Sequence, residues 1–360
     1  MTESRQFDEI NVILGNSNPR FSGVTSTLLQ TLQVQQHMLG IKVMGKYHLP
    51  DASLAISFWQ TIKLCHTPLK SDRPRVFHAR RNDEMIQALL LKHVFRCPIR
   101  IMFTSTAQRH HSKFTRVLMS KMDAVISTCQ AAANYLETPP ATQIHHGVDT
   151  TFWHPEENKQ QLLKQLGQQL HFNSDYGIGI FGRVRKQKGV HLFVRAAIEV
   201  LAHETNVTAI IGGAISDDNR DFVEGLKQEI AQAGLEKRII FIGEQPFEII
   251  PQLMRSVSLV AALSDNEGFG LTPLEALSSA TAVLTTSAGA WPEIVENGKN
   301  GFIVDIDDQQ AVTERLQQLL LDKKALKAMG DYGRLQVLEK YTVEQEARAL
   351  VEFYTQLQQQ

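Results

Sequence analysis

Short apolar runs alternate with segments of helical spacing along most of this chain. In the first half, apolar runs predict buried strands at residues 10–15, 75–79, 99–103 and 123–127. Helical spacing between or after these runs predicts helices at residues 24–39, 84–95, 111–121 and 130–136. Strands that alternate with helices predict a parallel sheet covered on both faces.

A second series of the same kind begins at residue 176. Its predicted strands are residues 176–181, 207–211, 238–242, 257–263, 282–285 and 301–304. Several of these strands end in glycine, which is typical of ligand sites at the carboxyl edge of a doubly wound sheet. After residue 308 the chain is predicted to be helical, with a glutamine-rich tail, residues 356–360, that we expect to fray.

The length of 360 residues exceeds one typical core and predicts two α/β domains. We place the first domain at residues 1–165 and the second at residues 166–340. Residues 341–360 are expected to form a helix that packs back on the first domain. The composition, 43% hydrophobic and 21% charged, is ordinary for a soluble protein.

The chain shows no sign of export or membrane insertion. The N-terminus, residues 1–5, is polar and shows no signal peptide, and no apolar run reaches the roughly 18–20 residues of a membrane span. The cysteines Cys65, Cys97 and Cys129 are odd in number and widely spaced, which argues against a disulfide framework or a zinc site. These features favour a cytoplasmic protein.

Positive charge is concentrated in residues 70–121. This segment contains twelve Lys or Arg and three Asp or Glu, in a chain whose net charge is −1. These charged side chains could simply lie on helix faces that are exposed to water. Alternatively, they could face an anionic lipid surface or a phosphorylated substrate. A nucleic-acid partner is not supported, because no aromatic interleaving or known binding motif accompanies the charges.

A basic loop follows the first strand of the second series. Gly182, Arg183, Lys188 and Gly189 belong to a turn between that strand and a predicted helix at residues 190–202. Two cations beside a helix N-terminus could bind one diphosphate, although the loop could also be a solvated turn. The loop lacks the spacing of a Walker motif.

Two glutamates, Glu267 and Glu275, flank a glycine turn and a predicted helix start. Free backbone N–H groups at such a start suit a phosphorylated ligand, and a carboxylate on each side could hold sugar hydroxyls. Glu275 also has a structural interpretation, because Thr272, Pro273 and Glu275 could form a helix N-terminus with a capping box. Glu267 has no such local partner in the sequence.

Together these features resemble the family-4 retaining glycosyltransferases, which have the GT-B fold. The resemblance extends from residue 144 to about 305. The matching elements are Gly182-Arg183 with Lys188-Gly189, Glu267 with Glu275, residues 290–295 with Asn300-Gly301, and residues 146–149. Residues 103–109, 114–116 and 122–126 look like the lipopolysaccharide core mannosyltransferases of Gram-negative bacteria.

This resemblance implies two Rossmann-like doubly wound domains that face a central cleft, and it implies residue roles. Arg183 and Lys188 would neutralise the donor diphosphate. Glu267 would face the donor sugar, and Glu275 would accept hydrogen bonds from both ribose hydroxyls. The other implied donor-binding residues are Gly23, Gly182, Gly243, Gly268, Phe269, Gly270 and Leu271.

The sequence departs from the family pattern near the acceptor. Many members carry a histidine directly after the strand that ends near residue 103, whereas His110 and His111 come a few residues later. We keep both as candidate catalytic residues, although each could be a surface residue. A retaining transfer can also proceed without a protein base, because the departing phosphate can take the acceptor proton.

The resemblance therefore implies retaining hexosyl transfer onto a lipopolysaccharide or lipooligosaccharide core. GDP-mannose is the first donor candidate and a UDP-hexose the alternative. The acceptor would be a lipid-linked, phosphorylated oligosaccharide on an anionic inner membrane, with which the cytoplasmic enzyme would associate peripherally. A sugar-nucleotide epimerase and a non-catalytic sugar-nucleotide-binding module are more distant alternatives. No cofactor or metal is expected, and Asp305 and Asp307 are interpreted as part of a structural turn.

Overall fold

The computed structural model describes residues 9–360, so the polar N-terminal residues 1–5 lie outside the described residues. The described chain forms two compact units. One contains the residues up to Gly147 together with Val343–Gln360, and the other is Val148–Thr342. The boundary expected at residue 165 falls inside helix α6 (Lys159–Leu170).

The first unit contains a six-stranded parallel sheet in the order β3-β2-β1-β4-β5-β6. Its strands are β1 (Val12–Gly15), β2 (Ile41–Met44), β3 (Ala55–Ile56), β4 (Arg75–Ala79), β5 (Ile99–Ser105) and β6 (Ala124–Ser127). The chain runs outward from β1 to β3 and then returns to β4, so the strand order reverses between β1 and β4. In such sheets, ligands bind in the crevice at this reversal.

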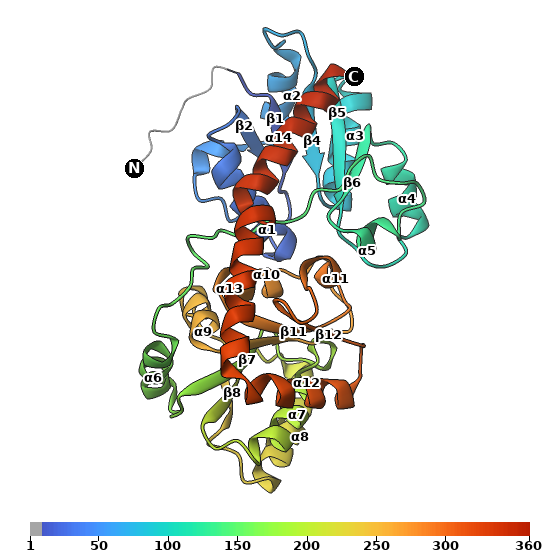
Figure 1. The fold of residues 1–360 in the computed structure, drawn as a ribbon. Helices are drawn as coiled ribbons and strands as arrows, with labels where there is room; N and C mark the ends of the chain where they lie inside the picture. Colours follow the sequence, from blue (N-terminus) through green and yellow to red (C-terminus); the bar gives the residue numbers. More distant parts are fainter. Residues whose placement is uncertain (1–8) are drawn as a thin grey trace. The chain divides into compact units, whose positions relative to one another are not determined.

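Helices cover both faces of the first sheet. They are α1 (Gly23–Gln35), α2 (Phe58–His66), α3 (Asn82–Leu89), α4 (Lys113–Met119), α5 (Gln130–Ala133) and α14 (Val343–Gln359), and a π-helical turn, η2 (Leu90–Val94), continues α3. Val12 and Leu14 pack toward α1 and α14, which lie side by side on one face (Figure 1). Ile13 points to the other face, toward Met85 of α3.

The C-terminal tail differs from its prediction. Residues 356–360 were expected to fray, but helix α14 continues to Gln359. Leu357 is buried in the same cluster as Leu350 and Val12. This burial holds the last turn in place, although the glutamines around Leu357 gave no sign of it.

The second unit contains another six-stranded parallel sheet, in the order β12-β11-β10-β7-β8-β9. Its strands are β7 (Tyr176–Phe181), β8 (Val207–Gly212), β9 (Ile239–Gly243), β10 (Leu259–Ala262), β11 (Ala282–Thr286) and β12 (Gly301–Val304). Here the order reverses between β7 and β10. The predicted class of two doubly wound parallel sheets is therefore confirmed.

Helices also cover this second sheet. They are α6, α7 (Val190–Leu201), α8 (Arg220–Gln232), α9 (Ile250–Ser256), α10 (Thr272–Ser278), α11 (Trp291–Ile294), α12 (Gln309–Leu321) and α13 (Lys323–Lys340). Among residues 9–360, no helix is both long enough and apolar enough to cross a membrane.

Candidate active site

The basic loop after β7 is shaped by two glycines. Gly182 has φ +135° and Gly189 has φ +69°, backbone conformations that residues other than glycine rarely adopt. A Cβ at Gly189 would lie 2.2 Å from the carbonyl oxygen of Leu263, at the end of β10. These constraints hold the loop against β10 and start α7 directly after it.

The two cations of this loop have different surroundings. Arg183 is exposed, and within residues 9–360 its guanidinium forms no ion pair or hydrogen bond. The Lys188 ammonium forms an ion pair with Oε1 of Glu267, in the loop after β10. The loop therefore presents one free cation and one paired cation.

Glu267 has partners that the sequence did not reveal. In addition to Lys188, the hydroxyl of Ser264 donates to Oε1 of Glu267 at 2.8 Å. The carbonyl oxygen of Ser264 in turn accepts a hydrogen bond of 2.6 Å from the hydroxyl of Thr286, at the end of β11. The carboxylate is thus fixed where the strand order of the second sheet reverses.

The glycine turn after Glu267 packs against Trp291 of α11. Gly270 has φ +80°, and its carbonyl accepts a hydrogen bond of 2.9 Å from the indole N–H of Trp291. A Cβ at Gly270 would lie 2.4 Å from the same indole nitrogen. The carbonyl of Phe269 accepts from the backbone N–H of Ala290 at 2.9 Å. These contacts fix Gly268, Phe269, Gly270 and Leu271 beside Glu267.

Glu275 lies in the first turn of α10, but the capping-box interpretation is wrong. Leu271 occupies the N-cap position, Thr272 is already helical, and no side chain caps the helix. Within the described residues, the Glu275 carboxylate has no hydrogen-bond or ion-pair partner. Burial raises its pKa to about 7. This carboxylate is free to accept hydrogen bonds from a ligand.

A narrow crevice at the carboxyl ends of β7 and β10 brings four of the predicted residues together. Gly182, Arg183, Lys188 and Glu267 line it, together with Trp291. Gly243, at the end of β9, has φ +68° and is not among the residues that line this crevice. The loops after β7 and β10 thus meet in one crevice. Its lining does not include Glu275 or the turn residues Gly268, Phe269, Gly270 and Leu271.

The histidine candidates lie in the first unit. His111 is partly buried, and its Nε2 lies 3.1 Å from the hydroxyl of Ser105, at the end of β5. Burial, and then the charge of Arg109, lower the pKa of His111, which favours the neutral imidazole. His110 is exposed and contacts the ring of Tyr135 edge-on. Of the two, His111 is the one held at the carboxyl edge of the sheet.

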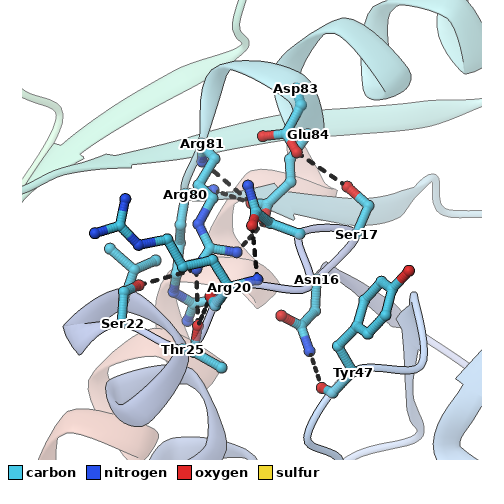
Figure 2. A network of polar contacts seen from close by, with 12 residues as sticks. Asn16, Ser17, Arg20, Ser22, Thr25, Tyr47, Arg80, Arg81, Asp83 and Glu84 are labelled. Atoms are coloured by element: carbon cyan, nitrogen blue, oxygen red, sulfur yellow. Dashed lines mark hydrogen bonds and ion pairs between the residues drawn. The ribbon is translucent and has the colours of Figure 1, made fainter.

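Gly23, the remaining donor-binding candidate, is the first residue of α1, and a Cβ there would meet nothing within 4 Å. The same region contains a polar network that the sequence did not reveal (Figure 2). Arg81 donates from Nη2 to the hydroxyls of Ser22 and Thr25, at 3.0 and 2.7 Å. The buried Glu84 accepts from the backbone N–H of Arg81 at 3.1 Å. This network joins the ends of β1 and β4, where the first strand order reverses.

Burial raises the pKa of Glu84 to about 7, although the charges of Arg80 and Arg81 oppose that shift. In the sequence, Arg80 and Arg81 counted only as part of the basic segment. The Ser and Thr residues at the start of α1 were the sequence feature that could have indicated hydrogen-bond partners for these arginines.

Within residues 9–360, no group of three or more His, Cys, Asp or Glu side chains could hold a metal ion. Asp307, one of the two aspartates interpreted as structural, lies in the left-handed conformation after β12, with φ +61°. Metal-independent activity stays a prediction.

Comparison with known proteins places this site in a family. Residues 155–336 match the model of the glycosyl transferases group 1. A lipopolysaccharide core biosynthesis mannosyltransferase of Rhizobium leguminosarum bv. viciae, LpcC, is 39% identical over 97% of each chain. Its counterpart LpsB of Rhizobium meliloti is also 39% identical, over 97% of this chain and 98% of its own. The chain therefore belongs to the group 1 glycosyltransferases and is a glycosyltransferase.

Solved structures agree with this assignment. The C-terminal domain of a group 1 glycosyl transferase (LpcC) from Francisella tularensis is 41% identical, with a TM-score of 0.52 over 54% of this chain and 99% of its own. Anabaena HepE in complex with UDP and glucose is 20% identical, with a TM-score of 0.76 over 97% of this chain and 100% of its own. The latter likeness concerns the fold alone, which is GT-B.

Proposed function

We propose that this enzyme transfers mannose from GDP-mannose onto a lipopolysaccharide core acceptor, with retention at the anomeric carbon. The two mannosyltransferases of lipopolysaccharide core biosynthesis that share 39% identity over 97% of the chain support the reaction. The observation that carries the proposal is the crevice in which Arg183, Lys188 and Glu267 meet. A UDP-hexose is the alternative donor.

The cations of the crevice would stabilise the leaving group. Negative charge accumulates on the donor diphosphate as the glycosidic bond breaks, so fixed positive groups beside it lower the barrier. Arg183 is unpaired within the described residues and can meet this charge directly. The first N–H groups of α7, which follow Gly189, can add further donors.

Lys188 and Glu267 would change partners when the donor binds. A diphosphate competes with the Glu267 carboxylate for the Lys188 ammonium. Ser264 would keep Oε1 of Glu267 in place through its 2.8 Å hydrogen bond. The carboxylate could then accept hydrogen bonds from hydroxyls of the donor sugar.

Glu275 would bind the ribose of the donor. A vicinal diol can donate two hydrogen bonds to one carboxylate, and such bonds to an ionised group are roughly twice as strong as neutral ones. The unpartnered, partly buried carboxylate of Glu275 supports this role. On this proposal, donor binding favours the ionised form.

The acceptor would be a lipid-linked, phosphorylated oligosaccharide, and the enzyme would bind peripherally to the anionic inner membrane from the cytoplasm. Exposed apolar side chains within the basic segment support this. Val94, Phe114 and Val117 are 63%, 57% and 59% exposed, and Phe114 and Val117 share α4 with Lys113 and Arg116. Apolar side chains interspersed with cations suit an anionic lipid surface.

An aromatic cluster adjoins Val94. Trp59 of α2 is 70% exposed, and its ring lies 5.7 Å from that of Phe95, which directly follows Val94. Tryptophan is enriched where membranes meet water, because its ring is apolar and its N–H is polar. We call Trp59, Val94, Phe114 and Val117, together with Lys113 and Lys121, the lipid-facing surface.

A transfer assay tests the proposed function. The purified protein is incubated with GDP-mannose, UDP-glucose or UDP-galactose, with and without core-truncated lipopolysaccharide, and the products are separated by mass. The proposal predicts a hexose added to the acceptor, fastest with GDP-mannose. Transfer only from a UDP-hexose selects the alternative donor, and no transfer from any donor contradicts the proposed function.

A further inference from the structure

A pocket of the second unit lies at the amino ends of β11, β10 and β7, on the opposite edge of the sheet from the crevice. Its volume is about 470 Å³, and Lys159, the first residue of α6, is among the residues that line it. We infer that Lys159 is a nucleophile that captures a small, uncharged aldehyde or ketone in this pocket as an imine. This capture is separate from the proposed transfer and does not depend on it.

One wall of the pocket is fixed where α13 meets the turn before β11. Ala280 of this turn lines the pocket and is in the left-handed conformation, with φ +51°. A Cβ at Gly330 of α13 would lie 2.2 Å from the carbonyl oxygen of Ala280, so the close approach of the helix requires glycine. Leu326, one turn earlier on α13, is buried and also lines the pocket. These contacts hold α13 against the amino ends of the strands.

The amine of Lys159 is held by two hydrogen-bond acceptors. Its Nζ donates to the hydroxyl oxygen of Thr281 at 2.6 Å and to the carbonyl of Val257 at 3.3 Å. The Thr281 hydroxyl donates its own proton to the carbonyl of Met254 at 2.8 Å, so its oxygen is oriented to accept. Within residues 9–360 no carboxylate forms an ion pair with Lys159. Two acceptors satisfy both N–H groups of a neutral amine and leave its lone pair available, whereas an ammonium would keep a third N–H without a partner.

The surroundings of Lys159 favour the neutral amine. Burial lowers its pKa to about 7; the charges of Asp331 and Glu156 oppose this shift, and that of Lys327 adds to it. An ordinary lysine has a pKa of about 10.4, so at pH 7 Lys159 contains roughly 1,000 times more of the neutral form. Desolvated lysines of this kind attack carbonyl groups to form Schiff bases.

An aldehyde or ketone reacts with such an amine without a co-reactant. The nitrogen lone pair forms a bond to the carbonyl carbon, and the carbonyl oxygen leaves as water with the two protons of the amine. The imine nitrogen can then take a proton from water. The charges of Asp331 and Glu156 favour this protonated form, and its N–H can still donate to Thr281.

The charges of the lining favour an uncharged compound. Among the residues described as lining the pocket are four lysines and four acidic residues. When Lys159 is neutral, the remaining three cations face four anions, so an anionic compound would not be attracted. Two of these charges also satisfy each other, because Lys327 pairs with Asp331 at 2.6 Å. The volume lies within the range of about 300–1,000 Å³ found for small-molecule sites, so a small hydroxyaldehyde can enter.

Reductive trapping on the full-length protein tests this capture. Glycolaldehyde, a neutral hydroxyaldehyde, is added with cyanoborohydride between about pH 6 and 9, and peptide mass spectrometry measures the labelling rate at each lysine. At pH 7 we expect Lys159 to be labelled at least about tenfold faster than Lys237, an exposed lysine of the same unit that forms no ion pair among residues 9–360. The rate at Lys159 should level off above about pH 7, whereas the rate at Lys237 should keep rising.

The rate at Lys159 should also saturate with glycolaldehyde concentration, because the compound first occupies the pocket. Labelling of Lys159 that is no faster than that of Lys237, or that does not saturate, would overturn the inference, whether or not the enzyme transfers mannose. These rates are measured on the unmodified enzyme, so they decide the matter even where a variant is unstable.

A matched pair of variants locates the reactive amine. Lys159→Met should lose the saturable label, whereas Lys237→Met should keep it. Donor affinity should be unchanged in both, because the crevice lies at the other edge of the sheet. A saturable label that persists in Lys159→Met would place the reactive amine elsewhere and contradict the inference.

Discussion

Lys188 and Glu267 form an ion pair that joins the loop after β7 to the loop after β10, across the point where the strand order of the second sheet reverses. Each residue belongs to a separate sequence motif, and the two stand 79 positions apart. The family resemblance implies that one binds the donor diphosphate and the other the donor sugar. On the proposed function, their contact would bring the diphosphate and the sugar of the donor side by side, as transfer of a sugar away from a phosphate requires.

Alanine variants of Arg183 and Lys188 should lose a similar amount of activity but differ in thermal stability. Arg183→Ala and Lys188→Ala should each reduce kcat/KM by about 100- to 1,000-fold, the range for loss of one charge-stabilising donor. Arg183→Ala should leave Tm unchanged, since its guanidinium has no partner in the described chain. Lys188→Ala should lower Tm slightly, because it breaks a partly buried ion pair. The control is Lys186→Ala, a lysine of the same loop that does not line the crevice, and this variant should keep full activity. Wild-type rates in Arg183→Ala and Lys188→Ala would show that these two cations do not bind the diphosphate.

Glu275 should make donor binding depend on pH. Its pKa is about 7 in the free protein, and ribose binding should lower that pKa by favouring the ionised form. Affinity should therefore be highest above pH 7 and fall as the pH drops through 7, by at most about tenfold per pH unit. Calorimetry at several pH values measures the affinity for the intact sugar nucleotide. The intact donor is used because it has no terminal phosphate that titrates in the same pH range. Glu275→Gln should bind the donor more weakly and lose the pH dependence; wild-type affinity in this variant would rule out the ribose role.

Chelation should not affect activity. Within residues 9–360 no cluster of carboxylates, histidines or cysteines is arranged to bridge a metal to the diphosphate. Transfer rates measured with and without EDTA should agree. A rate that falls with EDTA and returns with Mg²⁺ or Mn²⁺ would show that a metal takes part.

The lipid-facing surface should bind anionic vesicles through both charge and apolar contact. Replacing Lys113 and Lys121 together with Gln should weaken binding to phosphatidylglycerol vesicles by about five- to thirtyfold at low salt, since each cation near such a surface contributes about 1 kcal/mol. The remaining binding should weaken as salt rises, because the Debye length falls to about 3 Å at 1 M.

Phe114→Ser with Val117→Ser should weaken vesicle binding at every salt concentration, because these side chains act through apolar burial. Leu321→Ser, which replaces an exposed leucine on α12 of the other unit, is the control and should bind normally. Equal binding to neutral and anionic vesicles, or no binding at all, would show that the cations only solvate their helices.

The sequence predicted strands where apolar runs were long enough to stand out. β4, β7 and β12 have the predicted bounds. β2 and β3 were not predicted, because Lys42 interrupts one apolar run and the other strand has only two residues. Both strands are held by pairing with their neighbours in the sheet, which local pattern does not reveal.

The sequence motifs named four residues that the folded chain brings into one crevice. Gly182, Arg183, Lys188 and Glu267 could be named because the spacing of their motifs is local. The hydrogen bond from Trp291 to Gly270 and the network around Arg81 depend on strands that are adjacent only in the folded sheet. The capping box at Glu275 failed because a Thr-Pro-x-Glu pattern does not determine which residue becomes the N-cap.

Glu267→Gln tests the central claim, that the crevice between β7 and β10 is the reaction centre. A contact that strengthens in the transition state appears in kcat, whereas a contact made only to the nucleotide appears in affinity. We therefore predict a clear loss of kcat for mannosyl transfer, with nucleoside-diphosphate affinity close to that of the unmodified enzyme. Tm should fall only slightly, as in Lys188→Ala, because the same ion pair is lost. Wild-type kcat in Glu267→Gln would contradict the claim and place the chemistry elsewhere.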